Sequence, residues 1–207
     1  MIVGSVHAGF STALVNGANS VDLPQANLTI VAISILNGAV VSIPIDSSRN
    51  AFFMNGGYLS EHPVKNHVHF QVNGQTLNFN SYGTSGQVIF YYGYVYGDSR
   101  PLTAYAGVLA TASLSAATTG SLSFSFPSGE LNLTAMKFKV SATYTWMEAQ
   151  FNTSSGQSLT MGQDPYIATN LDGDLFQLWL ATATTLTVNL TFNAAITATV
   201  TGVAYYA

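Results

Sequence analysis

The chain has 207 residues, with five Lys or Arg, nine Asp or Glu and a net charge of −4 at pH 7. So few cations form no basic stripe that could neutralise phosphates, and we expect no direct nucleic-acid binding. Because the chain has no cysteine, it can form neither a disulfide framework nor a thiolate metal site. A surface this poor in charge must be solvated by Ser, Thr and Asn, covered by sugar, or buried against other subunits.

The longest uncharged stretches, 101–129 and 175–207, alternate apolar residues with Ser, Thr or Asn instead of forming a solid apolar run. This pattern predicts strands, so we expect no transmembrane helix. Neither a basic segment nor a compact apolar segment follows Met1, and no secretion signal is recognisable. The chain is expected either to start as translated or to have lost a signal and gained Met1.

Residues 2–14 alternate in strand fashion at the start of the chain. The apolar side chains on one face of this segment include Ile2, Val6, Phe10 and Leu14. Such a strand can reach onto an adjacent subunit, or it can close the edge of its own sheet. Residues 1–15 are therefore a candidate assembly arm or edge strand.

Two later runs, 28–36 and 88–96, are apolar on both faces. Strands of this kind are expected to be covered on both sides, by a second sheet and by a neighbouring subunit or loop. The dipeptide Asn37-Gly38 lies between 28–36 and 39–45. It predicts a hairpin that joins those two strands.

The segment 104–118 is rich in Ala and Leu and could hold a short helix. In 121–126, Leu and Phe alternate with Ser, and in 137–146 apolar residues alternate with Lys, Ser and Thr. Both patterns predict strands with one face exposed to solvent.

The longest alternation covers 185–201, where Asn193-Ala194 marks either a turn or a bend in one long strand. Together the segments offer about ten strands and no convincing amphipathic helix. The sequence therefore predicts an all-β fold, a single antiparallel β-sandwich of the jelly-roll type that occupies residues 1–207.

His67 and His69 stand two residues apart, so on a strand their side chains project from one face, as paired metal ligands can. The residues that follow, Phe70 to Gly74, include no carboxylate to complete a site of the cupin kind. Val68, Phe70 and Val72 form the apolar face of the same segment. We interpret the histidines as exposed or interface residues and expect no metal and no other cofactor.

Asn170, Asp172 and Asp174 place oxygen atoms at alternate positions, as the start of a calcium loop does. The helix-loop-helix calcium motif also needs Gly at loop position six and Glu at position twelve, where this chain has Leu175 and Ala181. The pattern predicts a hairpin turn at Asp172-Gly173 and leaves a weak calcium site open.

Gly97-Asp98-Ser99 resembles the nucleophile block of one esterase superfamily, whose serine needs a histidine base and an orienting acid. No histidine follows Ser99, and the chain has no Gly-x-Ser-x-Gly elbow and no phosphate loop. The nine acidic residues lie in separate segments and suggest no catalytic carboxylate pair. We therefore expect no enzymatic activity.

Tyr91, Tyr92, Tyr94 and Tyr96, with Phe90, could form a platform on which sugar rings stack. The other interpretation, which we favour, is that these rings pack in the core and in an interface.

Four sequons make asparagine glycosylation possible, because each has Thr or Ser two residues after the asparagine. Their asparagines are Asn27, Asn132, Asn152 and Asn189. Alternation puts Asn132 and Asn189 opposite apolar neighbours, so both are expected to face solvent.

The low charge, the absence of cysteine, the wet faces rich in Thr and Asn and the continuous β pattern resemble small jelly-roll capsid or turret proteins. Those proteins belong to icosahedral viruses of thermoacidophilic archaea. The resemblance implies a structural protein of a virion, whose partners are copies of itself and other structural subunits. In acid, carboxylates lose their charge, so a shell built from packing and neutral hydrogen bonds would be insensitive to pH. The chain departs from the many Lys/Glu ion pairs typical of hyperthermophile proteins.

Two other functions remain open. One is an extracellular subunit of a cell-surface filament or adhesin, in which residues 2–14 are donated to the next subunit. The other is a carbohydrate-binding module that uses the tyrosines.

Overall fold

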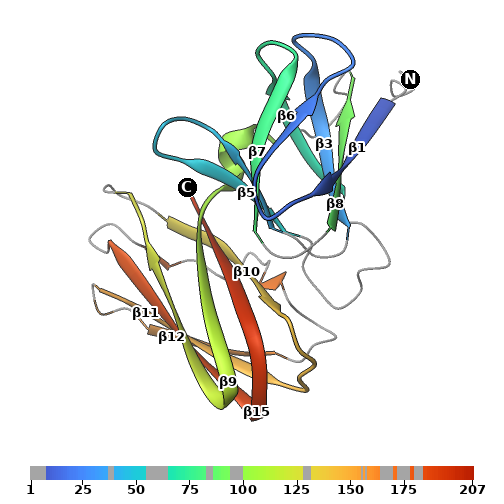
Figure 1. Cartoon of the computed structure of the whole chain (residues 1–207). Helices are drawn as coiled ribbons and strands as arrows, with labels where there is room; N and C mark the ends of the chain where they lie inside the picture. Colours follow the sequence, from blue (N-terminus) through green and yellow to red (C-terminus); the bar gives the residue numbers. More distant parts are fainter. Residues whose placement is uncertain are drawn as a thin grey trace, which may run out of the picture. The chain divides into compact units, whose positions relative to one another are not determined.

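The computed structural model describes residues 8–36, 40–54, 65–82, 86–93, 100–127, 132–154, 156, 158–163, 170–171, 178–179 and 184–207. These residues form strands joined by turns, with one short 3₁₀ helix, η1 (Leu102–Tyr105) (Figure 1). The strands pair antiparallel and the sheets pack together, so the predicted all-β sandwich is confirmed.

The chain divides into two compact units. The first contains Met1–Asn55 and Leu59–Ala106, and the second contains Gly56–Tyr58 and Gly107–Ala207. This division differs from the single domain expected over 1–207. Alternation shows where strands lie but not which strands share a core, and no charged linker marks the boundary in the sequence.

One sheet of the first unit has the strand order β1-β8-β3-β6. Its members are β1 (Ala8–Leu14), β8 (Gly86–Tyr92), β3 (Thr29–Leu36) and β6 (Lys65–Gln71), and all neighbours are antiparallel.

The other strands of the first unit have the order β2-β7-β4-β5. They are β2 (Gly17–Asp22), β7 (Thr76–Tyr82), β4 (Val40–Pro44) and β5 (Asn50–Met54), again all antiparallel.

A single apolar core lies between these two layers. Ile33 and Phe90 enter it from the β1-β8-β3-β6 sheet, and Val41, Phe53 and Phe79 enter it from the other layer. The rings of Phe79 and Phe90 meet edge to face, with 5.3 Å between their centroids. Full burial of each such side chain contributes about 1.5–3 kcal/mol, so this core is the main source of stability in the unit.

The predicted Asn37-Gly38 hairpin is wrong. β3 pairs with β6 and β8, whereas β4 pairs with β5 and β7, so the two strands belong to different layers. A strand that is apolar on both faces can be buried in either layer, and the local turn signal alone does not decide its partners.

The prediction of burial on both faces is confirmed for β3 and not for β8. Every residue from Ile30 to Ile35 is at most 6% exposed. In β8, Val88 and Phe90 are buried, whereas Ile89 and Tyr91 are half-buried. Residues 94–96 of the predicted strand lie outside the described residues.

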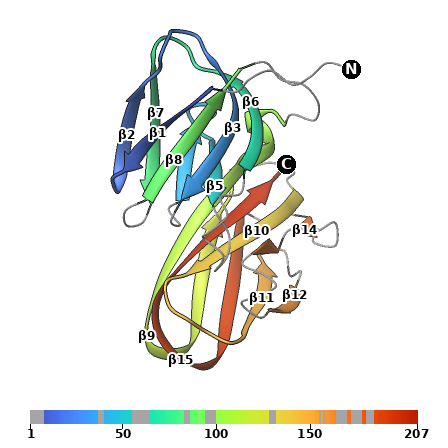
Figure 2. The same cartoon turned by 90° about the vertical axis from the view of Figure 1, so that its right-hand side faces the viewer.

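Two long strands, β9 (Ala106–Ser125) and β15 (Thr185–Tyr206), form an antiparallel ribbon in the second unit. The register is interrupted between Thr191 and Ala198, and Ala116 adopts a positive φ of 46° on the opposite strand. Asn193-Ala194 therefore lies within one long bent strand, the second of the two predicted alternatives. Figure 2 shows the ribbon turning back at this bend.

The remaining strands pair with different halves of β15. β11 (Met147–Thr153) pairs with 186–192, and β12 (Ser158–Gln163) follows on its far side. β10 (Asn132–Val140) pairs with 200–206 and also with the two-residue strands β13 (Asn170–Leu171) and β14 (Leu178–Trp179). Each half of the ribbon is thus the centre of its own layer.

The two layers of the second unit face each other across a second apolar core. Phe138 of β10 and Phe151 of β11 are fully buried, with ring centroids 6.3 Å apart. Phe126 and Tyr206, at the two ends of the ribbon, meet edge to face at 5.8 Å. The bend therefore folds one ribbon into a sandwich.

Two local predictions need correction. The segment 104–118 contains no α-helix: η1 ends at Tyr105 and β9 begins at Ala106. β10 ends at Val140 instead of continuing to 146. Just beyond Val140, the Ser141 N–H donates to the Thr199 carbonyl at 3.0 Å, but the Thr199 N–H donates to the Ser141 hydroxyl at 2.8 Å, so a side chain makes one of the two bonds at the strand end.

Candidate functional site

The described part of the N-terminal segment closes the edge of its own sheet. β1 pairs with β8 in continuous register from Ala8↔Tyr92 to Leu14↔Gly86. Leu14 is buried in the first core, and the Phe10 ring stacks on Phe90 with centroids 5.4 Å apart. Ile2 and Val6, the other two apolar residues of the candidate arm, lie outside the described residues.

The outer face of the same sheet carries small side chains on β1. Gly9 and Ala13 are exposed. A Cβ atom on Gly9 would lie 3.3 Å from Cδ1 of Tyr91, so the tyrosine ring lies over the glycine. Tyr91 thus belongs to the outer face, whereas Tyr92 packs against the core.

The opposite edge of this sheet, β6, is covered by residues 100–105. The N–H of His69 donates to the Arg100 carbonyl at 2.9 Å, and His69 forms a parallel bridge with Pro101. The Tyr105 hydroxyl donates to the carbonyl of His67. All these contacts are made by backbone atoms of β6. None of them involves the imidazole of His67 or His69.

His67 and His69 are exposed, whereas Val68 and Val72 are buried. The predicted alternation is confirmed at these four positions. Among the described residues, no group of three or more His, Cys, Asp or Glu side chains could hold a metal ion.

The predicted outward direction of Asn132 and Asn189 is confirmed, because both are exposed. Asn189 lies in the middle of a layer, opposite Ser121 of β9 and Gln150 of β11. Its side chain therefore projects from the exposed face of the sheet.

The other two sequons are held by local hydrogen bonds. Asn27 adopts a positive φ of 59°, and its Oδ1 accepts the Gly74 N–H at 3.0 Å. Asn152 is half-buried, and its Oδ1 accepts the Ser158 hydroxyl at 3.1 Å. Asn27 and Asn152 therefore have a structural role, because their side chains hold the neighbouring loop or strand in place.

One layer of the second unit presents a polar face, which carries the half-buried Glu148 of β11 among neutral side chains. A row formed by Ser121, Asn189, Gln150 and Thr160 crosses β9, β15, β11 and β12, and all four side chains are exposed. Hydroxyl and amide groups do not titrate in the range where carboxylates lose their charge. The hydration of this row is therefore insensitive to acid, whereas Glu148 on the same face can titrate.

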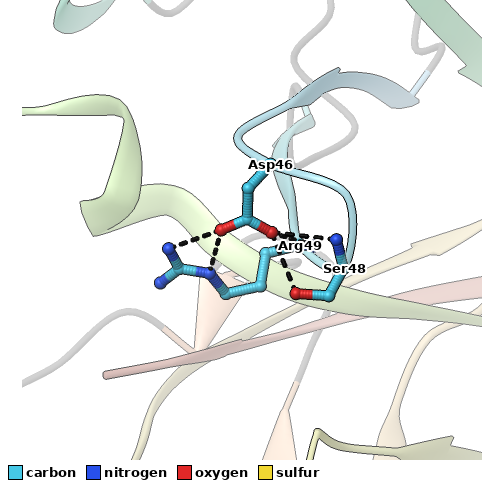
Figure 3. A network of polar contacts seen from close by, with 3 residues as sticks. All are labelled: Asp46, Ser48 and Arg49. Atoms are coloured by element: carbon cyan, nitrogen blue, oxygen red, sulfur yellow. Dashed lines mark hydrogen bonds and ion pairs between the residues drawn. The ribbon is translucent and has the colours of Figure 1, made fainter.

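The β4–β5 turn holds a polar network that the sequence analysis does not single out (Figure 3). Oδ1 of Asp46 accepts the N–H and the hydroxyl of Ser48, each at 2.9 Å, and Oδ2 accepts Arg49 Nε at 2.7 Å. The signal was an Asp followed by two Ser between apolar runs, which is typical of a turn in which the aspartate binds its own backbone.

This network lowers the pKa of Asp46 well below its ordinary value of 3.8. The main cause is the hydrogen bond from the Ser48 N–H, followed by those from the Arg49 side chain and the Ser48 hydroxyl. The Asp46–Arg49 ion pair is more than one third exposed, so its role is to shape the turn.

Two of the five cations lie on β10. The ammonium group of Lys137 lies over the ring of Tyr205, 5.7 Å from its centroid. Burial lowers the pKa of Lys139. Both lysines are half-buried.

Several candidate residues lie outside the described residues: Tyr94, Tyr96, Ser99, Asp172 and Asp174. The sugar platform, the calcium turn and the serine block therefore stay predictions.

Within the described ranges, no helix is long and apolar enough to cross a membrane. The chain matches no protein-family model and no curated protein sequence.

Proposed function

We propose that this chain is a structural, self-assembling protein, a capsid or vertex component of a virion. The observation that carries the proposal is the strand order of the first unit, β1-β8-β3-β6 facing β2-β7-β4-β5. This order supports the interpretation of the first unit as an eight-stranded jelly roll, a fold in which two sheets are joined by Greek-key connections. Since one fold can serve many functions, the proposal depends on analogy with other proteins of this fold.

Jelly rolls occur in viral capsids, in lectins and in cupins. A cupin needs a metal-ligating interior, whereas the core described here is lined by Ile33, Val88, Phe79 and Phe90. The polar face of the second unit supports a structural role in an acid medium, because its exposed row of hydroxyl and amide side chains does not titrate where carboxylates lose their charge.

The filament alternative has less support. A donated strand must leave its own domain, whereas β1 pairs with β8 of the same chain along its whole length. The carbohydrate-binding alternative depends mainly on Tyr94 and Tyr96, which lie outside the described residues.

Sedimentation of the purified full chain from about pH 3 to about pH 7, followed by negative-stain imaging, tests the proposal. We expect association into closed shells, rings or sheets at both extremes of pH. A monomer at every concentration and pH would contradict the proposal. Fibres would favour the filament, and a monomer that binds a glycan array would favour the carbohydrate module.

A further inference from the structure

We propose that the outer edge of β1 joins a second copy of this chain, with the two β1 strands antiparallel across a two-fold axis. The inference rests on the proposed function, because it names one contact through which the subunits would assemble. It concerns the outer edge of β1 in the first unit and not the polar face of the second.

β1 is an open edge among the residues that the structure describes. It pairs with β8 on one side, and no described strand pairs with the other. An antiparallel edge strand leaves alternate N–H and C=O groups without a partner, and these groups form a template for another strand.

The sequence of β1 lacks the features by which edge strands avoid pairing. It contains no charged residue and no proline, and its register with β8 has no bulge over seven residues. Natural sheets usually protect such an edge with a charge, a proline, a bulge or a covering segment.

Two other edges of the first unit do show protection. β6 is covered through the contacts of His67 and His69 with residues 100–105. β2 ends in Asp22, whose carboxylate accepts the Thr76 hydroxyl at 3.0 Å, so a charge stands on that edge. In the β1-β8-β3-β6 sheet, residues 100–105 thus cover the β6 edge, whereas no described strand pairs with the outer edge of β1.

A second copy fits this edge because the pairing of identical antiparallel strands is self-complementary. A two-fold axis perpendicular to the sheet keeps the inner and outer faces of the two copies aligned. Phe10 and Leu14 then continue the apolar inner face across the junction, while the exposed Ala13 presents only a small side chain on the outer face. Since β1 carries no charge, no repulsion opposes the contact.

The same symmetry makes a geometric prediction. An antiparallel pair about such an axis places one residue of β1 directly opposite its own copy, with Cα atoms about 4.5–5.5 Å apart. This separation lies inside the range that a disulfide can span. Because the chain has no cysteine of its own, a single introduced cysteine reports this contact without interference.

The test uses the full chain with each position from 9 to 13 replaced in turn by cysteine, under mild oxidation. We expect one of these variants to form a disulfide-linked dimer in high yield and its neighbours to form little. Ser20→Cys, on the edge strand β2, is the matched control and should stay uncrosslinked.

A second variant, Ser11→Lys with Ala13→Lys, puts like charges against each other across the junction. We expect its self-association constant to fall at least about tenfold while the circular dichroism spectrum is unchanged. The matched control, Ser158→Lys with Thr160→Lys on the uncharged edge strand β12, should associate like the unmodified chain. If the β1 lysines prevent folding, the cross-linking yields of the cysteine variants still show whether two β1 strands pair.

Association that persists in the folded β1 lysine variant, together with no cross-linked dimer at any of the five positions, would overturn this inference and leave the proposed function standing. Loss of association in the β12 variant alone would also overturn it. An unmodified chain that never associates would contradict the proposed function itself.

Discussion

The ring of Phe124 occupies the space that a side chain at Gly202 would need. A Cβ atom on Gly202 would lie 2.9 Å from Phe124 Cζ and 2.9 Å from Leu122 Cδ1. Phe124 and Leu122 belong to one half of the β9–β15 ribbon and Gly202 to the other, so the glycine sets how closely the two layers approach.

Gly202→Ala should therefore destabilise the second unit by about 1–3 kcal/mol, the usual effect of overpacking a core. Urea unfolding measures this change. The matched variant Gly120→Ala should have a smaller effect, because its new Cβ meets only the side chain of Leu114, which can rotate. Equal stability of Gly202→Ala and the unmodified chain would show that the layers are more loosely packed than described.

Asp46→Asn should lower the melting temperature at neutral pH. The pKa of Asp46 is lower in the folded chain than its ordinary value of 3.8, so the carboxylate favours folding fully above that pH. The contribution declines as the pH falls below 3.8 towards the folded pKa. Melting curves of both proteins across this range should therefore converge in acid.

The companion variant Ser48→Ala keeps the backbone hydrogen bond to Asp46 and removes only the hydroxyl. It should lower the melting temperature less than Asp46→Asn. A difference between Asp46→Asn and the unmodified chain that is independent of pH would contradict the role assigned to the ionised carboxylate.

His67→Gln with His69→Gln should change the stability by no more than about 0.5 kcal/mol, because both imidazoles are exposed and only their backbone groups hold residues 100–105. Tyr105→Phe, in contrast, removes the hydroxyl that donates to His67 and should cost about 0.5–1.5 kcal/mol. Thermal melting compares the two. A large loss in the histidine variant that added Zn²⁺ reverses would reveal a metal site.

Sugar attached to native material should be found at Asn189 or Asn132, the two sequon asparagines that are exposed on strands. Intact-mass measurement detects it, and Asn189→Gln or Asn132→Gln should remove the corresponding mass. A native mass equal to the bare 21.9 kDa chain would exclude a sugar coat as the explanation of the low charge.

Deletion of residues 2–14 should unfold the first unit, because it removes β1 together with the core contacts of Phe10 and Leu14. Circular dichroism and limited proteolysis report the loss. Deletion of residues 2–7 alone keeps β1 and should keep the fold. A folded chain after the longer deletion would show that β1 is dispensable for the core.

The sequence predicts well whatever depends on alternation within one strand. Leu186, Val188 and Leu190 are buried and Asn189 is exposed, as a period of two requires. His67 and His69 follow the same rule. Alternation alone therefore assigns exposed side chains such as these to the surface.

The sequence predicts poorly what depends on distant partners. Nothing near Asn37-Gly38 indicates that β3 and β4 join different layers, because the layer of each strand is set by a distant partner, β8 for β3 and β7 for β4. The bend at Ala116 has no local signal, since alanine rarely adopts a positive φ. The division into two units follows from these long-range strand pairings.

The ribbon also has a consequence for the order in which the protein forms during synthesis. β15 is central to both layers of the second unit, yet it follows β9, β10, β11 and β12 along the chain. These earlier strands leave the ribosome before the strand that unites them, whereas the first unit already has all of its strands. We expect the first unit to fold during translation and the second to wait for β15, with its unpaired edges exposed to aggregation in the interval.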